Sequence, residues 1–321
     1  MYIACCVLRI NPGTTDGGGL KPKDWLAFIA LSLAWGSSFF WIKIAVTEIG
    51  PFLLVALRLL FGLLGLAVVV LLRRPAWPKD RRAYWALLIL GLTNTALPFV
   101  LISWAEQHID SAVAAILNSS VPLFTMLIAH FVLSDDRMTR QRVFGLLVGF
   151  IGVIVLTVRD LSGDVRLNLL AQAAMLLAVL FYAGSSVFIR RNTQGISPIV
   201  QALVPLIIAD ALIWAGALAA ESPLQFPQIG QTWFALAWLG LIGSCLAYLL
   251  YYYLVHSIGP TRATMVTYTF PIVGIVLGVY VLPLLGYPAE VLDLNLVAGT
   301  VLILGSLLIV NRRPAVVAKP A

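Results

Sequence analysis

Ten apolar runs follow one another along the chain, and short polar segments separate them. About 20 apolar residues in a helix are enough to cross the hydrocarbon core of a bilayer. The pattern therefore predicts an all-α integral membrane protein with ten transmembrane helices. Their expected ranges are 25–47, 51–72, 83–104, 110–133, 141–159, 169–190, 199–218, 232–254, 262–283 and 294–311.

The two halves of the chain carry the same pattern. A shift of 149 residues brings identical residues together, which are Gly91 and Gly240, Ile109 and Ile258, and Pro122 and Pro271. Because each half holds an odd number of helices, the second copy must enter the bilayer upside down relative to the first. Inverted repeats are typical of secondary transporters, whose binding site lies between the copies. We expect two inverted five-helix repeats over 25–160 and 165–311, with a flexible cytoplasmic tail at 1–24 and a cytoplasmic tail at 312–321.

Composition supports a membrane protein and excludes a soluble domain. The chain is 61% apolar and only 11% charged, with a mean hydropathy of +0.98, whereas globular proteins are about a quarter charged. The first 24 residues lack the long apolar core and cleavage site of a secretory signal. The three cysteines, Cys5, Cys6 and Cys245, show no paired spacing, and phosphate-binding and metal-binding motifs are missing. We therefore expect no metal and no other cofactor.

The net charge of +7 reflects topology. All but four of the 21 basic residues lie in the predicted tails and the loops on one side of the membrane. The four others are Arg159 and Arg166 on the opposite side, and Lys43 and Arg58 within helices. Since Lys and Arg collect in cytoplasmic loops, we expect both termini to be cytoplasmic in a multi-pass inner-membrane protein with no nucleic-acid partner.

Polar residues at membrane depth usually face the bundle interior or a water-filled cavity. In the third, fourth, eighth and ninth helices such residues, with the two repeated prolines, recur at helical spacing and share one face of each helix. They are Asn94, Asn118, Pro122, Ser244, Tyr248, Tyr252, Thr267, Tyr268 and Pro271. We interpret this face as the lining of a substrate cavity. The alternative is that the Ser, Thr and Tyr side chains only bond neighbouring helices.

The repeated prolines support the cavity. A proline inside a helix deprives the carbonyl four residues earlier of its hydrogen bond and kinks the axis. In a membrane that carbonyl must be satisfied by protein or by cavity water. Kinks at Pro122 and Pro271, beside Asn and Thr side chains, therefore favour a polar cavity near the midplane.

Two cations within helices allow two interpretations each. A charge at membrane depth is costly, so Arg58 needs a partner or water. Lys43 lies near a helix end, where the helix dipole and snorkelling reduce that cost. Either cation could attract a substrate carboxylate. Alternatively each could form a structural pair, with Glu48 or with a helix-end carbonyl.

Asp210 is the one acid near the middle of a predicted helix. An isolated carboxyl in apolar surroundings readily holds a proton, which suits a residue that couples transport to protons. The alternative is a neutral acid bonded to a neighbouring helix. Asp210 is therefore the coupling candidate.

At this point the sequence resembles a known family. Residues 33–43 (LAWGSSFFWIK) and 51–58 (PFLLVALR) resemble the first two helices of the EamA-like drug/metabolite transporters, and the resemblance extends over about 25–311. It implies a ten-helix carrier of small metabolites, often an exporter of amino acids or related compounds. Trp35 and Ser38, within the first segment, join the candidate substrate-binding residues. Asp136 departs from the family pattern, which usually has Glu there.

The expected function is therefore secondary transport of a small metabolite, an amino acid or a related compound, by alternating access in the direction of export. The expected partners are the small-molecule substrate and the lipid bilayer, with protons as a coupling ion to be tested. A multidrug cation carrier is the alternative, but it needs an acid in the first helix, where this chain has Lys43. A membrane enzyme would need clusters of His, Asp or Glu, which the sequence lacks, so we expect no catalytic residue.

Overall fold

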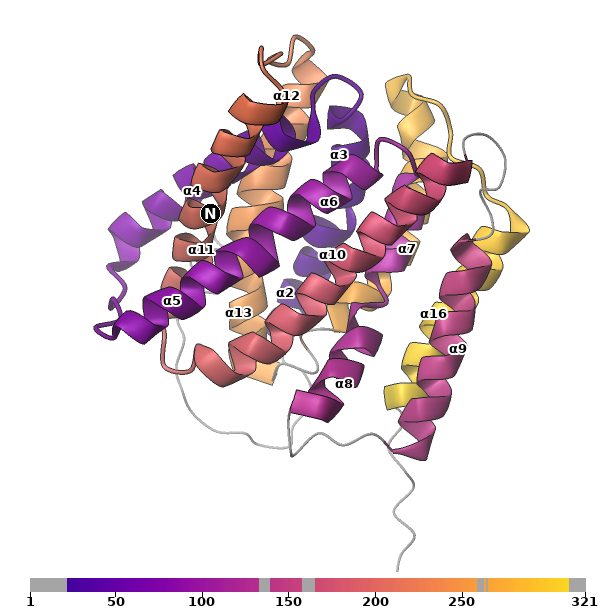
Figure 1. The fold of residues 1–321 in the computed structure, drawn as a ribbon, viewed down its shortest axis with the longest axis horizontal. Helices are drawn as coiled ribbons and strands as arrows, with labels where there is room; N and C mark the ends of the chain where they lie inside the picture. Colours follow the sequence, from indigo (N-terminus) through magenta and orange to yellow (C-terminus); the bar gives the residue numbers. More distant parts are fainter. Residues whose placement is uncertain (1–21, 133–138, 158–164, 259–262, 264, 312–321) are drawn as a thin grey trace, which may run out of the picture.

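The computed structural model describes residues 22–132, 139–157, 165–258, 263 and 265–311, and this part of the chain is helical without strands (Figure 1). The helices of the first half are α2 (Pro22–Gly36), α3 (Ser38–Ala45), α4 (Pro51–Arg73), α5 (Arg81–Leu90), the π-helix η1 (Gly91–Ala96), α6 (Leu97–Ala105), α7 (Ser111–Asn118), α8 (Val121–Val132) and α9 (Arg140–Thr157). Those of the second half are α10 (Val165–Asn192), α11 (Pro198–Ala220), α12 (Gly230–Ala237), the π-helix η3 (Trp238–Leu246), α13 (Ala247–Ile258), the 3-10 helix η4 (Met265–Thr269), α15 (Phe270–Ile275), the π-helix η5 (Val276–Val281), the 3-10 helix η6 (Leu282–Leu285) and α16 (Leu294–Asn311).

Within the described residues, eight helical segments are long and apolar enough to cross a membrane. They are Pro22–Ala45, Pro51–Arg73, Arg81–Ala105, Ser111–Val132, Val165–Asn192, Pro198–Ala220, Gly230–Leu254 and Met265–Leu285. The other two predicted spans correspond to α9 and α16, which form a pair of their own. Ten spans in two inverted copies therefore stay a prediction.

One boundary of the predicted organisation needs correction. The first helix begins at Pro22, so residues 22–24 are helical and do not belong to a flexible tail. The first turn is held in place because Tyr253 Oη and Ser257 Oγ donate hydrogen bonds of 2.8 and 2.7 Å to Asp24 Oδ1. The rest of the predicted N-terminal tail and the tail at 312–321 lie outside the described residues.

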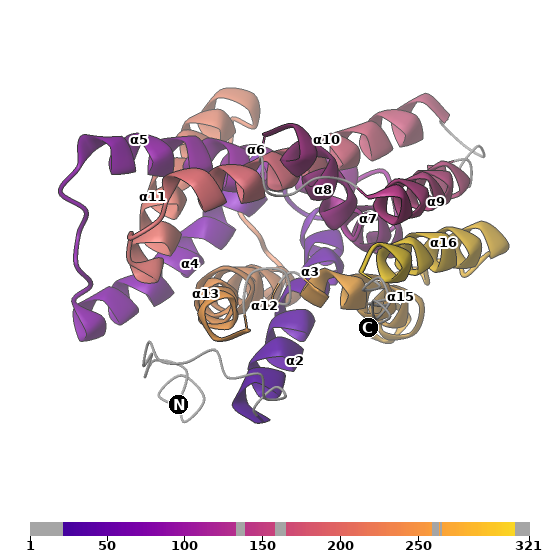
Figure 2. The ribbon, with the colours of Figure 1, turned by 90° about the horizontal axis from the view of Figure 1, so that it is seen from below.

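The helices of the two halves meet in corresponding pairs. Helix α4 packs against η3, and α11 packs against η1, which occupies the matching place in the first half. In the same way α10 contacts α6 and α8, while α2 contacts α13 and α15. Helices α9 and α16 lie side by side at one edge of the bundle (Figures 1 and 2). They are close because Gly152 faces Leu302 and Ile303, and small residues let membrane helices approach each other.

Three carboxylates fasten one half to the other at a single end of the bundle, the upper end in Figure 1, which we call the α3 end. Glu221 accepts hydrogen bonds from the amides of Phe52 (2.8 Å) and Leu53 (2.9 Å) at the start of α4. Glu290 does the same at the start of α7, and Glu48 at the start of α12. A carboxylate is favourable there because the first amides of a helix lack partners and carry partial positive charge. Closure of this end therefore depends on contacts between the halves.

Replacing Glu48 with glutamine is expected to lower the thermal stability slightly at neutral pH. Burial on its own raises the pKa of Glu48, but hydrogen bonds, among them those from the amides of Gln228 and Ile229, hold it below its usual value of 4.5. The stabilisation is thus present above pH 4.5 and is lost as the pH falls through the lower folded-state pKa. Because the side chain is only partly buried, we expect about 0.5 kcal/mol. Melting curves of detergent-solubilised wild type and Glu48→Gln are recorded at several pH values. The difference between their melting temperatures should disappear in acid, and a difference that is the same at every pH would contradict this.

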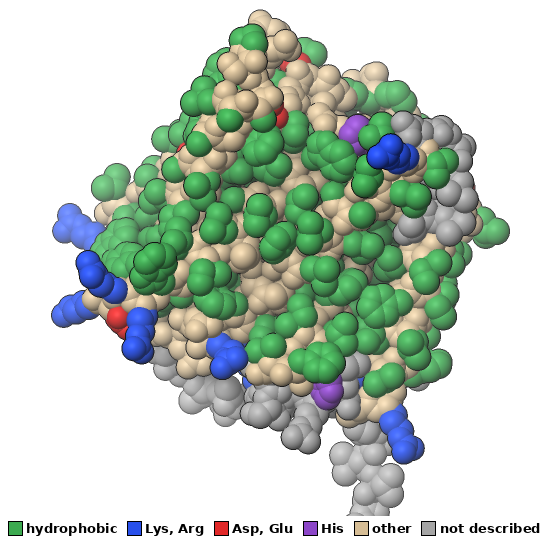
Figure 3. Space-filling model, viewed as in Figure 1, with side chains coloured by type: hydrophobic (Ala, Val, Ile, Leu, Met, Phe, Trp, Pro, Cys, Tyr) green, Lys and Arg blue, Asp and Glu red, His purple; other side chains and the backbone are tan. Residues whose placement is uncertain are grey.

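The surface agrees with a bilayer environment. Figure 3 shows apolar side chains spread over the visible face, while Lys and Arg gather mainly along its lower and lower-left margin, where α4 ends and α5 begins. Large exposed apolar side chains, such as Leu71, Phe144 and Leu308, occur on helices from both halves. A belt of this kind is unfavourable in water and favourable in lipid.

Candidate functional site

A cavity with an empty volume of about 970 Å³ lies between the two halves, among α2, α3, α4, η1, α6, α7, α8, α10, α13, η4 and α15. Eight of the candidate residues line it, namely Trp35, Ser38, Arg58, Asn94, Asn118, Tyr248, Tyr252 and Thr267. Six do not, namely Lys43, Pro122, Asp210, Ser244, Tyr268 and Pro271. The third, fourth, eighth and ninth helices contribute as predicted. Helix α10, the predicted sixth helix, also contributes to the wall, although none of its residues was among the candidates.

Arg58 is the charged group of the cavity. Its side chain is 4% exposed, and its Cζ lies 3.9 Å from the ring centroid of Phe99. Its Nε donates a hydrogen bond of 3.2 Å to Ser244 Oγ, which itself donates to the Leu239 carbonyl at 3.0 Å. Among the described residues no carboxylate forms an ion pair with Arg58. The guanidinium is thus held in place from one side, with charge left over for a ligand.

Ser244 therefore acts indirectly. It is fully buried on η3 and contacts Arg58 without lining the cavity. Its π-helix and η1 coincide when the chain is shifted by 149 residues, since Gly91–Ala96 then falls on Gly240–Cys245. Widened π-helical turns occur frequently at functional sites, and here they carry Asn94 in one half and the Arg58 partner in the other.

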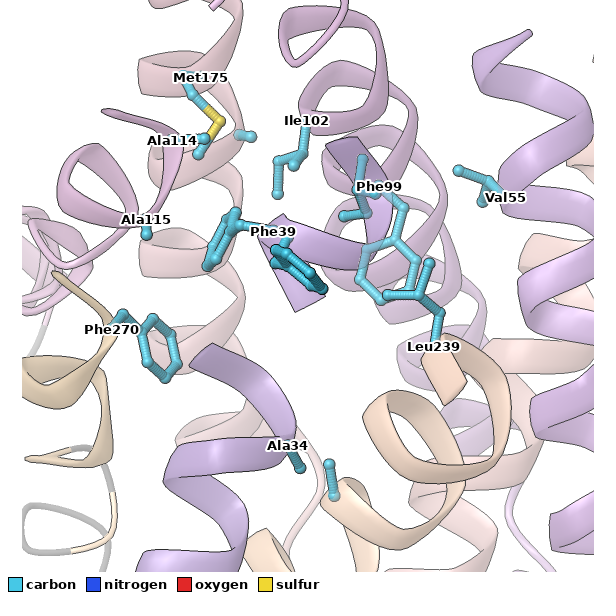
Figure 4. Close-up of a cluster of buried hydrophobic side chains, with 14 of the residues drawn as sticks. Ala34, Phe39, Val55, Phe99, Ile102, Ala114, Ala115, Met175, Leu239 and Phe270 are labelled. Atoms are coloured by element: carbon cyan, nitrogen blue, oxygen red, sulfur yellow. The ribbon is translucent and has the colours of Figure 1, made fainter. Parts of the chain in front are cut away.

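Aromatic rings form much of the remaining wall. Trp35 is fixed because its Nε1 donates to the Gly243 carbonyl at 3.1 Å, and its ring lies 5.3 Å from that of Tyr251. Tyr248 and Tyr252 are stacked with their ring centroids 6.4 Å apart. Figure 4 shows Phe39, Phe99 and Phe270 gathered around the same space from three different helices. Such a wall suits a ligand with an apolar or aromatic body.

The two repeated prolines mark breaks in the helices. Helix α7 ends at Asn118, and α8 begins at Val121, so Pro122 occupies its first turn. Pro271 likewise lies in the first turn of α15, after the 3-10 helix η4 that carries Thr267. Neither proline lines the cavity, but both breaks expose polar groups there. Asn118 is 7% exposed, and its Oδ1 has no hydrogen-bond partner among the residues described.

Lys43 binds backbone carbonyls and does not line the cavity. Its Nζ donates to the carbonyls of Glu106 (2.9 Å) and Ile109 (2.8 Å), just past the end of α6. This geometry matches the structural alternative, a helix-end carbonyl, and the other proposed partner, Glu48, lies at the start of α12. A role for Lys43 in attracting a substrate has no support from its position.

Two more candidates lie away from the cavity. Asp210, on α11, is 9% exposed, and no described residue forms a hydrogen bond with its Oδ1. Tyr268 is partly buried against the apolar core. A coupling role for Asp210 stays a prediction, since the cavity wall does not include it.

The sequence interpretation missed several residues. Tyr182, Ser186 and Ile189 of α10 line the cavity, and their spacing of four and three residues on one helix was the available signal. Glu106 is fully buried next to Lys43, and neither of its carboxylate oxygens has a hydrogen-bond partner in the described part of the chain. No periodic signal marks Glu106, because it follows the last residue of an apolar run.

Comparison with known proteins agrees with this architecture. The model of the EamA-like transporter family matches residues 23–158 and 169–312. The uncharacterised inner membrane transporter YedA of Escherichia coli K12 is 29% identical over 253 residues, covering 78% of this chain and 80% of YedA. An uncharacterised transporter of Archaeoglobus fulgidus is 26% identical over 296 residues, covering 91% of this chain and 99% of its own.

A solved crystal structure shares the fold. It superposes with a TM-score of 0.62 at 20% identity and covers 91% of this chain and 98% of its own. The family matches occupy both halves of the chain and together span most of its length. The chain therefore belongs to the EamA-like transporter family, and it is a membrane transporter.

Proposed function

We propose that this protein is a secondary transporter that moves a small metabolite with a carboxylate group, an amino acid or a related compound, across the inner membrane. The observation that carries the proposal is Arg58, a buried guanidinium on the cavity wall without a carboxylate partner among the described residues. A cation in a largely apolar cavity attracts an anion far more strongly than the same cation in water. A guanidinium also matches a carboxylate geometrically through two parallel hydrogen bonds.

The rest of the cavity fits the other parts of such a substrate. Its wall combines apolar and aromatic side chains with a few polar groups, as is typical of small-molecule sites. The rings of Trp35 and Tyr251 offer a surface for an apolar or aromatic side chain. The amide oxygens of Asn94 and Asn118 are acceptors for an ammonium group. The cavity therefore offers a cation for the carboxylate of a zwitterion and hydrogen-bond acceptors for its ammonium group.

The cavity disfavours the alternative, a multidrug cation carrier. The only ionised side chain on its wall within the described residues is Arg58, which repels a cationic ligand. The carboxyl of Glu106 is fully buried and does not line the cavity. A cationic drug would therefore lose water without gaining a counter-charge.

Alternating access is the proposed mechanism. The broken helices α7–α8 and η4–α15 and the corresponding pairs across the halves support inverted repeats that rock about the cavity. Helices α9 and α16 would complete ten spans and act as a scaffold at the edge. We assign the termini to the cytoplasm from the distribution of basic residues. Export as the direction of net flux follows from the family resemblance.

Counterflow in proteoliposomes tests the function. Purified protein is reconstituted into liposomes loaded with one unlabelled amino acid at a time, and uptake of the labelled compound is followed. We expect uptake above that of protein-free liposomes for at least one amino acid with an apolar or aromatic side chain. The matching amine, which lacks the carboxylate, should compete poorly. Failure of every amino acid, or equal competition by the amine, would overturn the proposed substrate class.

A further inference from the structure

Glu106 is a buried acid that the proposed transport step does not use. It directly follows the apolar span Arg81–Ala105, one helical turn beyond Ile102, which lines the cavity. Its side chain is 0% exposed, and neither carboxylate oxygen accepts a hydrogen bond from the residues that the structure describes. An ionised carboxylate in such a place would pay a large desolvation cost that no bond offsets. The closed structure therefore accommodates Glu106 only with a proton.

Three charged groups act on Glu106 from the surrounding elements. Burial, the largest effect, raises the pKa of Glu106, and Glu290 raises it further, while Lys43 and Arg58 lower it. The net pKa is well above the usual value. Glu290 is occupied by the Ser111 hydroxyl and by the amides of Ser111 and Ala112. Arg58 lies on the cavity wall against Ser244 and Phe99, whereas the Lys43 ammonium already contacts the Glu106 backbone, so Lys43 is the available partner.

Lys43 is positioned to change partners. In the structure its ammonium binds the backbone carbonyl of Glu106 itself, at 2.9 Å, and that of Ile109, at 2.8 Å. The same ammonium needs only side-chain rotation to approach the Glu106 carboxyl, which belongs to the residue that it already contacts. Two arrangements of one pair are thus available, a neutral acid with Lys43 on the carbonyls and an ion pair.

We propose that Glu106 is a proton-binding site that latches the α3 end of the cavity. The closed end keeps the carboxyl protonated. Opening of that end admits water, and the proton passes to water while the carboxylate pairs with Lys43. Closing reverses the step, so the proton is taken up again from the same side. This latch rests on the proposed alternating-access function, since it regulates the end of the cavity that must open in that cycle.

The latch has a defined effect on pH dependence. The protonated form belongs to the closed α3 end, so acid on that side favours closing and alkali favours opening. In an exporter whose α3 end faces outward, external acid would speed the return of the empty carrier. The hydrogen bonds of Glu48, Glu221 and Glu290 between the halves keep the α3 end closed. Glu106 loses its proton when water enters that end.

Infrared spectroscopy tests the proton without any substrate. In wild type near neutral pH we expect the carbonyl stretch of a protonated carboxylic acid, and Glu106→Gln should remove its largest component. Glu221→Gln is the matched control, because Glu221 lies at the same end with both oxygens on backbone amides. It should leave the band unchanged. An unchanged band in Glu106→Gln would overturn the proposal, and so would loss of the band in Asp210→Asn alone.

Lys43→Gln provides a second, independent readout if Glu106→Gln does not fold. An opposite charge at close range lowers the pKa of a carboxyl by about 1–3 units, so removal of Lys43 should shift loss of the acid band to higher pH by about one unit or more. An unshifted titration would overturn the Lys43 exchange. Counterflow supplies the functional readout, since the transport rate in Glu106→Gln should lose the pH dependence that the wild type shows. If wild type carried no amino acid, the proposed substrate would fail while the infrared test still decided the latch.

Discussion

Transport of carboxylate-bearing substrates is expected to fall by roughly 10- to 150-fold when Arg58 is replaced by glutamine. The variant loses a charged donor at the one cationic point of the cavity wall. A hydrogen bond to a charged group contributes about 1.5–3 kcal/mol, and each 1.4 kcal/mol is a factor of ten in affinity. Substrate affinity from counterflow at increasing concentrations is the measurement. Glutamine keeps a polar end and part of the aliphatic stem, but it is shorter and lacks the guanidinium that lies over Phe99.

Arg58→Lys separates charge from geometry. Lysine keeps the positive charge but loses the planar fork and the stacking of Cζ at 3.9 Å over Phe99. It should recover part of the lost affinity for a carboxylate substrate. The corresponding amine should be affected much less by either variant, since it has no carboxylate to lose. A change in carboxylate transport of less than about twofold in Arg58→Gln would be smaller than the loss of one charged hydrogen bond predicts. It would show that Arg58 does not bind the substrate.

The second large effect is expected at Gly240, where η3 crosses α4. A Cβ at this position would lie 2.5 Å from the Arg58 carbonyl oxygen and 2.8 Å from the Gly62 amide nitrogen, and it would overlap the Phe61 side chain. Two of these contacts are backbone atoms, so no side-chain rotation relieves them. Gly240→Ala must therefore push α4 away from η3. Overpacking of this kind costs about 1–3 kcal/mol, and more where the backbone has to move.

Two measurements follow from that displacement. Gly240→Ala should lower the temperature at which the detergent-solubilised protein loses its monodisperse form. It should also weaken transport, because Arg58 belongs to the turn of α4 that is displaced. Gly184→Ala, on α10, is the matched control, since a Cβ there meets nothing within 4 Å. It should be neutral or slightly stabilising, because alanine favours a helix over glycine by about 1 kcal/mol. Equal melting of the two variants would contradict the close crossing of α4 and η3.

The sequence predicted those parts of the fold that depend on local patterns. Helix α4 was expected at 51–72 and occupies Pro51–Arg73, because a continuous apolar run after a proline determines both its start and its length. The cavity wall was also predictable in part, because polar residues within apolar helices form a local pattern. Asn94, Asn118 and Tyr248 lie at membrane depth, where polar groups are costly unless they face the interior.

Features that depend on contacts between distant residues were not predictable. The Glu221 cap on α4 joins residues 169 positions apart, and no periodic pattern indicates such a pairing. Lys43 was assigned two structural partners, and only the packing of α3 against the end of α6 distinguishes them. Glu106 follows an apolar run and reads as a loop residue. Its burial depends on the elements that close over it, which one sequence does not specify.

A structure determined with a transported amino acid bound is the most direct test of the central assignment. We expect the substrate carboxylate to lie within hydrogen-bonding distance of the Arg58 guanidinium, with the substrate side chain against Trp35 or Tyr251. A substrate bound outside the cavity, or bound inside with its carboxylate turned away from Arg58, would contradict it.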